Sequence, residues 1–63
     1  TSPHRYLVMR RLGRAKQLLL AGSSLAGAAV ESGFADQAHL TRHFRDAFGI
    51  TPGRWLALQD RKD

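Results

Sequence analysis

The chain has 63 residues, of which ten are Lys or Arg and five are Asp or Glu, giving a net charge of +5 and a pI near 11.2. At this length it forms one domain at most, and burial of only ~60% of the unfolded surface predicts modest stability. The lack of cysteine excludes disulfides and a thiolate metal site, and it favours a reducing compartment. Because no apolar run approaches the ~20 residues of a membrane span and no secretory leader is recognised, we expect a cytoplasmic protein without a membrane partner.

The positive charge is concentrated in the first half of the chain. Residues 1–30 carry five cations and no acid, whereas residues 31–63 carry five cations and five acids. Such a basic segment favours a polyanion such as nucleic acid, or an anionic membrane surface. A solvated helix face gives the same pattern, so charge alone does not choose between them.

The first predicted helix begins at Ser2-Pro3, an N-cap followed by proline, and runs to Leu20 or Ala21 before Gly22. The helix is basic and amphipathic, as membrane-surface helices are. Its apolar stripe is, however, long enough to pack the later helices together, and a domain of this size needs it for that purpose. The stripe consists of Val8, Leu12, Ala15 and Leu19, with Tyr6, Met9 and Leu18 at its margins.

Two shorter helical patterns follow and meet at Gly33-Phe34. Ala29 precedes the glycine by four residues, where a small side chain lets the two helices approach closely. Gly33 accepts the positive φ of a sharp reversal at little steric cost. We expect Phe34 to be buried beneath this turn. The spacing is typical of a helix-turn-helix.

Capping residues set the bounds of the remaining helices. The second helix is predicted to run through Glu31 or Ser32 and the third from Gln37 to Phe48. The fourth is predicted to run from Pro52 to about Gln59, and we expect a polar, frayed tail from Asp60 to Asp63. The predicted N-caps are Ser23 or Ser24, Asp36 and Thr51, and Gly49 ends the third helix.

The third helix has two distinct faces. Leu40, Phe44, Ala47 and Phe48 fall on one apolar stripe, on which we expect Trp55 and Leu58 of the last helix to fold back. The opposite face is polar and is free for recognition. A helix of this kind fits the DNA major groove, where arginine can bind guanine or a phosphate and glutamine can pair with adenine. The exposed positions are Gln37, Ala38, Thr41, Arg42 and Arg45.

Two histidines on the third helix raise the question of a metal site. His39 and His43 are spaced i, i+4, but Leu40 follows His39, so the glutamate of an HExxH motif is absent. A metal needs three or four ligands, and the remaining histidine, His4, belongs to another helix. We therefore expect no metal or cofactor, and predict that both histidines contact phosphate or are simply exposed. No acid pair, nucleophile-base pair or phosphate loop is visible, so we expect no enzyme.

Taken together, these residues resemble the DNA-binding region of the AraC/XylS family of bacterial transcription regulators, from Ser2 to about Leu56. In that family a long linker helix joins two helix-turn-helix units, and the chain is similar to the linker helix and the second unit. The closing signature is specific because many spaced positions agree. The matching residues are Arg11-Leu12, Ala15 and Leu18-Leu19 in the linker helix, Ala28-Ala29 and Gly33-Phe34 in the scaffold helix and turn, and Asp36-Gln37, Leu40, Arg42, Phe44 and Phe48-Gly49-Ile50-Thr51-Pro52 in the closing signature.

The resemblance implies roles for individual residues. The base-reading positions of the family fall on Gln37, Ala38, Thr41 and Arg42. Backbone contacts fall near the helix N-termini at residues 23–24 and 51–53, where free N–H groups meet phosphate. Two positions depart from the family: Trp55 replaces the commoner tyrosine, and Leu56 replaces a common arginine, which moves any phosphate contact there to Arg54. The complete set expected on the DNA backbone is Ser23, Ser24, His39, His43, Arg45, Thr51 and Arg54.

The sequence thus predicts an all-α, homeodomain-like helix-turn-helix bundle of three to four helices. We expect residues 1–21 to be the linker helix and residues 22–63 the second unit of one compact domain, excised from a longer regulator. The expected partners are double-stranded DNA and the missing first unit and effector domain. The alternative is a protein-interaction module that contacts RNA polymerase or the regulator's own sensory domain.

Overall fold

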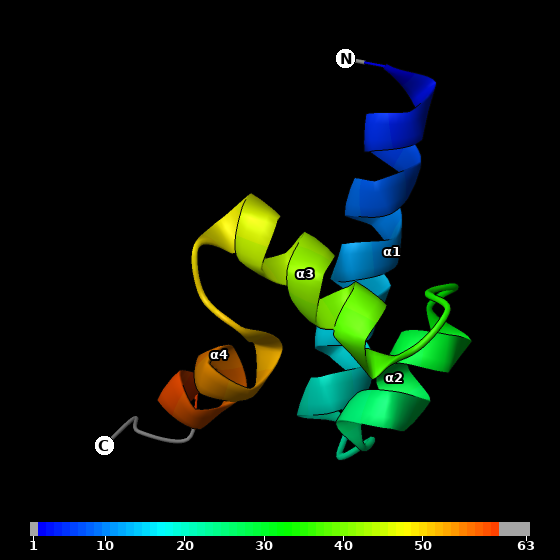
Figure 1. Cartoon of the computed structure of the whole chain (residues 1–63). Coiled ribbons are helices and arrows are strands. Elements are labelled where there is room, and N and C mark those ends of the chain that lie inside the picture. Colours follow the sequence, from blue (N-terminus) through cyan, green and yellow to red (C-terminus); the bar gives the residue numbers. More distant parts are fainter. Residues whose placement is uncertain (1, 60–63) are drawn as a thin grey trace.

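The computed structural model describes residues 2–59, which contain four α-helices: α1 (Pro3–Leu20), α2 (Leu25–Glu31), α3 (Gln37–Phe48) and α4 (Pro52–Gln59). In Figure 1, α2 and α3 lie against the second half of α1, while the first half of α1 projects beyond the other helices. The expected all-α fold and the four helices are confirmed. The tail Asp60–Asp63, expected to fray, lies outside the described residues.

Each helix begins at a side chain that accepts a hydrogen bond from the first turn. Ser2 accepts from the N–H of Arg5 at 3.1 Å, and Thr51 accepts from the N–H of Arg54 at 3.2 Å. Of the two serines that could cap α2, Ser24 does so, since its Oγ accepts from Gly27 N–H at 3.0 Å. These contacts satisfy backbone donors that have no partner within the helix.

The turn between α2 and α3 is closed by a pair of backbone hydrogen bonds. Phe34 N–H donates to the Ala29 carbonyl (2.9 Å) and Gly33 N–H to the Val30 carbonyl (3.1 Å), the pattern of a Schellman motif. Gly33 takes φ +97°, as the sequence predicted. Ser32 is buried and its hydroxyl donates to the Ala28 carbonyl, so no polar group is left unpaired at this point.

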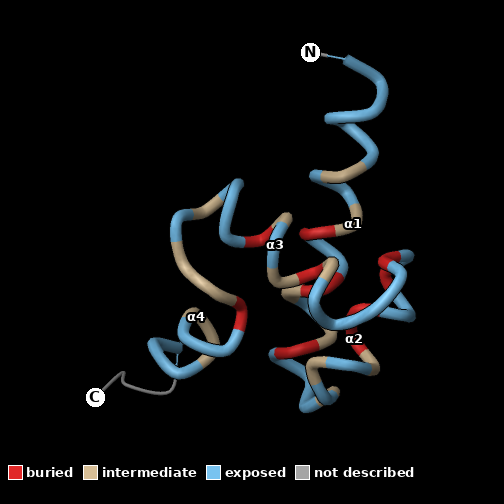
Figure 2. The backbone as a smooth tube through the Cα atoms, viewed as in Figure 1, coloured by how far each residue is buried: buried red, intermediate tan, exposed pale blue. Residues whose placement is uncertain are grey.

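The core lies where α1, α2 and α3 meet, and Figure 2 shows the buried residues gathered there. Phe34 is buried beneath the turn and Ala29 is fully buried, as predicted. The rings of Phe44 and Trp55 lie 5.8 Å apart, which ties α4 to α3. The core cluster consists of Leu12, Ala15, Ala29, Phe34, Leu40 and Phe44, with Val8, Phe48, Ile50 and Trp55 packed against it.

Two residues expected in the core are outside it. Leu58 is 50% exposed, because α4 packs on the body through Pro52 and Trp55 in its first half. Ala47 is exposed and lines an open groove between α1 and α3, together with Met9 and His43. The groove exists because the first half of α1 diverges from α3, so the apolar stripe of α3 has no partner there (Figure 1).

Candidate nucleic-acid interface

The side of α3 turned away from the core carries the residues predicted to read bases. Gln37, Ala38 and Arg42 are exposed and Thr41 is partly buried. They line one shallow, open surface of the helix with Arg45, opposite the buried Leu40 and Phe44. The structure therefore brings the four predicted base-reading residues together, and the surface offers guanidinium and amide donors beside methyl groups.

An acidic residue that the sequence reasoning passed over shares this surface. Asp46 lies on α3 one turn beyond Arg42 and next to Arg45, on the same exposed face. An arginine and an aspartate spaced i, i+4 lie close enough to interact on a helix. A carboxylate repels phosphate and can accept a hydrogen bond from cytosine N4. The spacing of Asp46 from Arg42 was the signal in the sequence.

The residues predicted to touch the DNA backbone are spread over several elements. Ser24 and Thr51 cap α2 and α4, so their side-chain oxygens already accept a backbone N–H. Arg54 is exposed in the first turn of α4 and Arg45 on α3, whereas Ser23 is partly buried just before α2. The caps leave each hydroxyl proton free to donate.

The two histidines of α3 face the turn and each other. Ala35 N–H donates to Nδ1 of His39 at 3.2 Å, and Nε2 of His39 lies 3.1 Å from Nε2 of His43. Both rings also pack on Phe34, with centroids 5.6 Å and 5.7 Å from that ring. Both histidines are partly buried. They are thus tied to the turn and are not freely exposed at the edge of the helix.

The surroundings of His43 disfavour its charged form. Burial lowers its pKa below the usual 6.5, and the neighbouring His39 lowers it further. Asp46 acts on this pKa in the opposite direction, and Arg42 and His4 add to the lowering. Residues 2–59 contain no group of three or more side chains suited to holding a metal.

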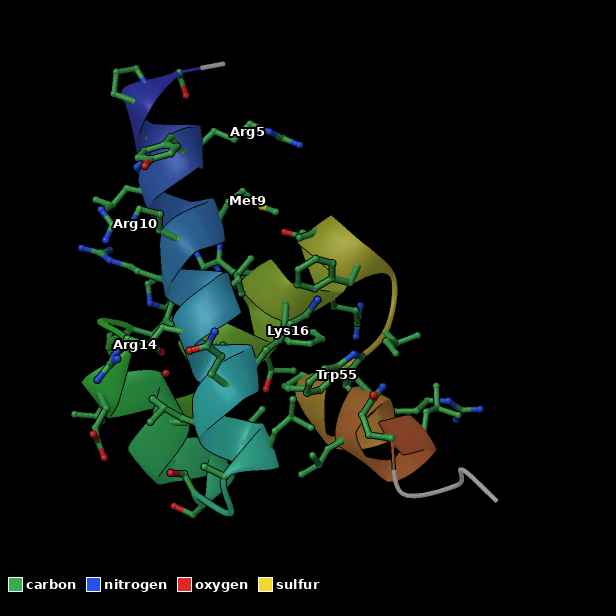
Figure 3. The ribbon with its side chains drawn as sticks, turned by 180° about the vertical axis from the view of Figure 1, so that it is seen from behind. Arg5, Met9, Arg10, Arg14, Lys16 and Trp55 are labelled. Carbon is green, nitrogen blue, oxygen red and sulfur yellow. The ribbon has the colours of Figure 1, made fainter. Side chains whose placement is uncertain are left out.

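Two of the five cations on α1 are engaged within the fold. Arg11 is partly buried and its side chain lies against Gly33 of the turn. Lys16 lies over the Phe48 ring, with Nζ 3.8 Å from the ring centroid, and also approaches Trp55. Figure 3 shows Lys16 pointing toward Trp55, whereas Arg10 and Arg14 project from the other side of α1. The exposed positive charge of α1 is therefore carried by Arg5, Arg10 and Arg14, which the count of charges alone did not reveal.

Comparison with known proteins identifies the same helix-turn-helix arrangement that the structure shows. The family described as "Helix-turn-helix domain" matches residues 1–57. The chain belongs to this family. As an AraC-type helix-turn-helix domain, it has relatives named as transcription regulators and not as enzymes. Within residues 2–59, no helix combines the length and the hydropathy that a membrane span requires.

Three curated relatives are 41% identical over 54 residues, or 84% of this chain. They are the virulence regulon transcriptional activator VirF of Yersinia enterocolitica, the thermoregulatory protein LcrF of Yersinia pestis and the HTH-type transcriptional regulator ExsA of Pseudomonas aeruginosa. The chain spans only 20%, 20% and 19% of their respective lengths. No solved structure gives a significant match to the chain.

Proposed function

We propose that this helix-turn-helix domain recognises DNA sequence by placing α3 in the major groove. The observation that carries the proposal is the division of α3 into two faces. Leu40 and Phe44 are fully buried, so the helix is fixed on the body, and the opposite face is free. An α-helix held this way can enter the major groove with its first half leading.

The proposed base contacts follow from the chemistry of the exposed side chains. Arg42 donates two hydrogen bonds to guanine O6 and N7, and Gln37 pairs with adenine from the first turn. Ala38 and the methyl group of Thr41 contact thymine methyl groups. All four residues share the free surface of α3, so one approach to the groove serves them together.

The proposed backbone contacts lie around this helix. Arg45 reaches a phosphate from the second half of α3, and Arg54 does so from the start of α4. Phosphates also meet the N-terminus of α2, which Ser24 caps and Ser23 precedes, and the N-terminus of α4, which Thr51 caps. A phosphate contact from His39 or His43 would compete with the hydrogen bond between His39 and the turn and with the hydrogen bond between the two rings.

Selection from a random duplex pool, followed by titration of the selected duplex at several salt concentrations, tests the proposal. Binding through phosphates loses affinity by about 0.9 log unit per log unit of salt for each phosphate neutralised. We expect a preferred sequence and an affinity that falls as the salt concentration rises, with a slope set by the few phosphates that one unit neutralises. A chain that enriches no sequence and binds every duplex equally would contradict the base-reading role.

A second candidate function rests on the first half of α1. Tyr6 is 60% exposed, and Leu7 and Met9 are also exposed there. Apolar groups in such a position suit a protein partner. We propose that residues 1–21 act as a linker helix to a first helix-turn-helix unit, with RNA polymerase or the regulator's sensory domain as further partners.

The response to salt separates this second function from DNA binding. An apolar protein contact persists as the salt concentration rises, whereas DNA binding falls. Calorimetric titration of the chain with purified RNA polymerase, at low and at high salt, measures the difference directly. Absence of heat at both concentrations would remove RNA polymerase from the proposed partners.

A further inference from the structure

His39 occupies the place that glutamate or glutamine holds in a helix capping box. The side chain of the N-cap residue, Asp36, accepts a hydrogen bond from the backbone N–H of His39 at 2.8 Å. The His39 side chain reaches back in turn and accepts from Ala35 N–H at 3.2 Å. In the usual capping box, the third residue of the helix is Glu or Gln and its side chain makes the returning bond. In that box the returning bond comes from the N–H of the N-cap residue, whereas the His39 imidazole accepts from Ala35, one residue before the cap Asp36. An imidazole can lose its acceptor by taking up a proton.

The hydrogen bonds determine which nitrogen carries each proton. Since Nδ1 of His39 accepts from Ala35, the proton of a neutral His39 is on Nε2. That Nε2–H then donates to Nε2 of His43, 3.1 Å away, so the proton of a neutral His43 is on its Nδ1. One proton arrangement therefore satisfies the turn and both rings at once.

The same arrangement argues against a shared metal ion. A histidine that ligates a metal through Nε2 needs a proton on Nδ1, which it donates to a carbonyl or carboxylate. At His39 the group facing Nδ1 is Ala35 N–H, which is itself a donor. If Nε2 of His39 ligated a metal, the proton on its Nδ1 would face Ala35 N–H, so two donors would point at each other. The pair is suited to a hydrogen-bonded clamp between the turn and α3.

Any added proton breaks one contact of this clamp, formed by Ala35, His39 and His43. A proton on Nδ1 of His39 removes the acceptor for Ala35 N–H. A proton on Nε2 of His43 removes the acceptor for Nε2–H of His39. The contact between the two rings can then persist only if the proton of His39 moves from Nε2 to Nδ1. In that case Nδ1 can no longer accept from Ala35 N–H, and the contact with the turn is lost instead. No singly protonated form keeps both contacts.

Charged groups from both helices face the clamp. From α1, His4 and Arg5 line the same groove as His43, and from α3, Asp46 does so. Arg42 also acts on His43 electrostatically. Cationic neighbours and partial burial thus oppose a charge on His43, and Asp46 is the group that favours one.

We propose that His39 and His43 are positioning residues that hold the first turn of the recognition helix in its DNA-binding orientation only while both imidazoles are neutral. This inference rests on the proposed function, because its consequence is measured on DNA. The first turn of α3 carries Gln37 and Ala38, so losing the clamp disturbs the leading end of the helix. Acidification therefore weakens binding, which is opposite to the effect of an exposed histidine that gains charge beside phosphate.

The decisive measurement is the affinity of the chain for the selected duplex at pH 7.5 and pH 5.5 and constant ionic strength. We expect the affinity to fall by about fivefold on acidification, the size associated with losing one capping hydrogen bond. His39→Gln keeps an acceptor for Ala35 N–H but does not titrate. Whatever the affinity of this variant at pH 7.5, the ratio of its affinities at pH 7.5 and pH 5.5 should lie near one. His4→Gln, the matched control, should retain the fall.

Nitrogen NMR of the three histidine side chains tests the clamp without DNA. At pH 7.5 we expect His39 as the Nε2–H tautomer and His43 as the Nδ1–H tautomer, and the Ala35 amide shift should move as they protonate. Circular dichroism at both pH values confirms that each variant is folded.

The opposite tautomer of His39, or a parent affinity that rises on acidification, would overturn the proposal. Failure of every variant to bind any duplex at pH 7.5, with the expected tautomers present, would contradict the DNA-binding proposal and leave the clamp supported.

Discussion

The Nζ atom of Lys16 lies 3.8 Å from the centroid of the Phe48 ring, and 5.4 Å from that of Trp55. This contact joins α1 to the end of α3 and to α4. A cation above an aromatic ring is attracted by the ring quadrupole, by ~0.5–2 kcal/mol depending on exposure. Lys16 is partly buried, so it contributes to holding α4 on the body.

Lys16→Gln should therefore lower the free energy of unfolding by ~0.5–2 kcal/mol. Arg14→Gln is the matched control, because it removes one positive charge from an exposed position of the same helix and should change stability by less than about 0.5 kcal/mol. Thermal and urea unfolding can be followed by the fluorescence of Trp55, the only tryptophan of the chain. If both variants lost the same amount of unfolding free energy, the contact of Lys16 with the rings would add nothing to the effect of removing one positive charge.

The course of the helices could be predicted from the sequence because local signals agreed with one another. Asp36 and Thr51 stand at helix starts, and Gly33 and Gly49 stand where φ is positive. Helical periodicity also identified the buried face of α3 over Leu40 and Phe44. Capping and periodicity are properties of neighbouring residues, so they are visible without knowledge of the fold.

Contacts that depend on how two helices diverge could not be predicted in this way. Ala47 lies on the apolar stripe of α3 by periodicity, yet it is exposed, because α1 leads away from α3 at that level. The position of Lys16 over Phe48 likewise depends on the angle between helices. The roles of His39 and His43 depend on single hydrogen bonds to the turn, which residue type and spacing do not specify.

Gly33→Ala should destabilise the domain by ~1–3 kcal/mol, the cost of a residue with a Cβ in a sparsely populated backbone region. Gly33 has φ +97°, and an added Cβ would lie 2.9 Å from Nε of Arg11. The arginine side chain can move aside, so the backbone conformation accounts for most of the cost. Gly13→Ala is the contrasting variant: nothing lies within 4 Å of the added Cβ inside α1, so stability should rise by about 1 kcal/mol. A Gly33→Ala variant as stable as the parent would contradict the turn geometry.

Stability should also depend on the protonation of His43. Its pKa is lowered in the folded chain, mainly by burial, so the unfolded chain takes up a proton more readily. The contribution of His43 to stability is thus fully present above its usual pKa of 6.5 and is lost as the pH falls below that value toward the folded pKa. Urea unfolding between pH 7.5 and pH 5 measures this slope. His43→Gln should flatten it, and an unchanged slope would assign the dependence to another group.

Arg42→Ala should cost ~1–3 kcal/mol of binding free energy on the preferred duplex and relax the preference at one base pair. Arg45→Ala, from the second half of the same exposed face, should weaken binding to all sequences alike. Competition with duplexes substituted at each position separates the two effects. If both variants lose affinity uniformly, Arg42 contacts only phosphate, and base preference must come from Gln37, Ala38 and Thr41.

The last prediction concerns the number of reading units. If the chain supplies one of two recognition helices, it makes few phosphate contacts by itself and should bind DNA with roughly micromolar affinity or weaker at physiological salt, near the non-specific range. A second unit joined through α1 would act at a high effective concentration and raise the affinity greatly. It would also steepen the salt slope, because more phosphates would be neutralised. Titration of the same labelled duplex with this chain and with the full-length regulator compares both quantities. Equal affinities and equal slopes would mean that these 63 residues form a complete reader and that the two-unit arrangement is wrong.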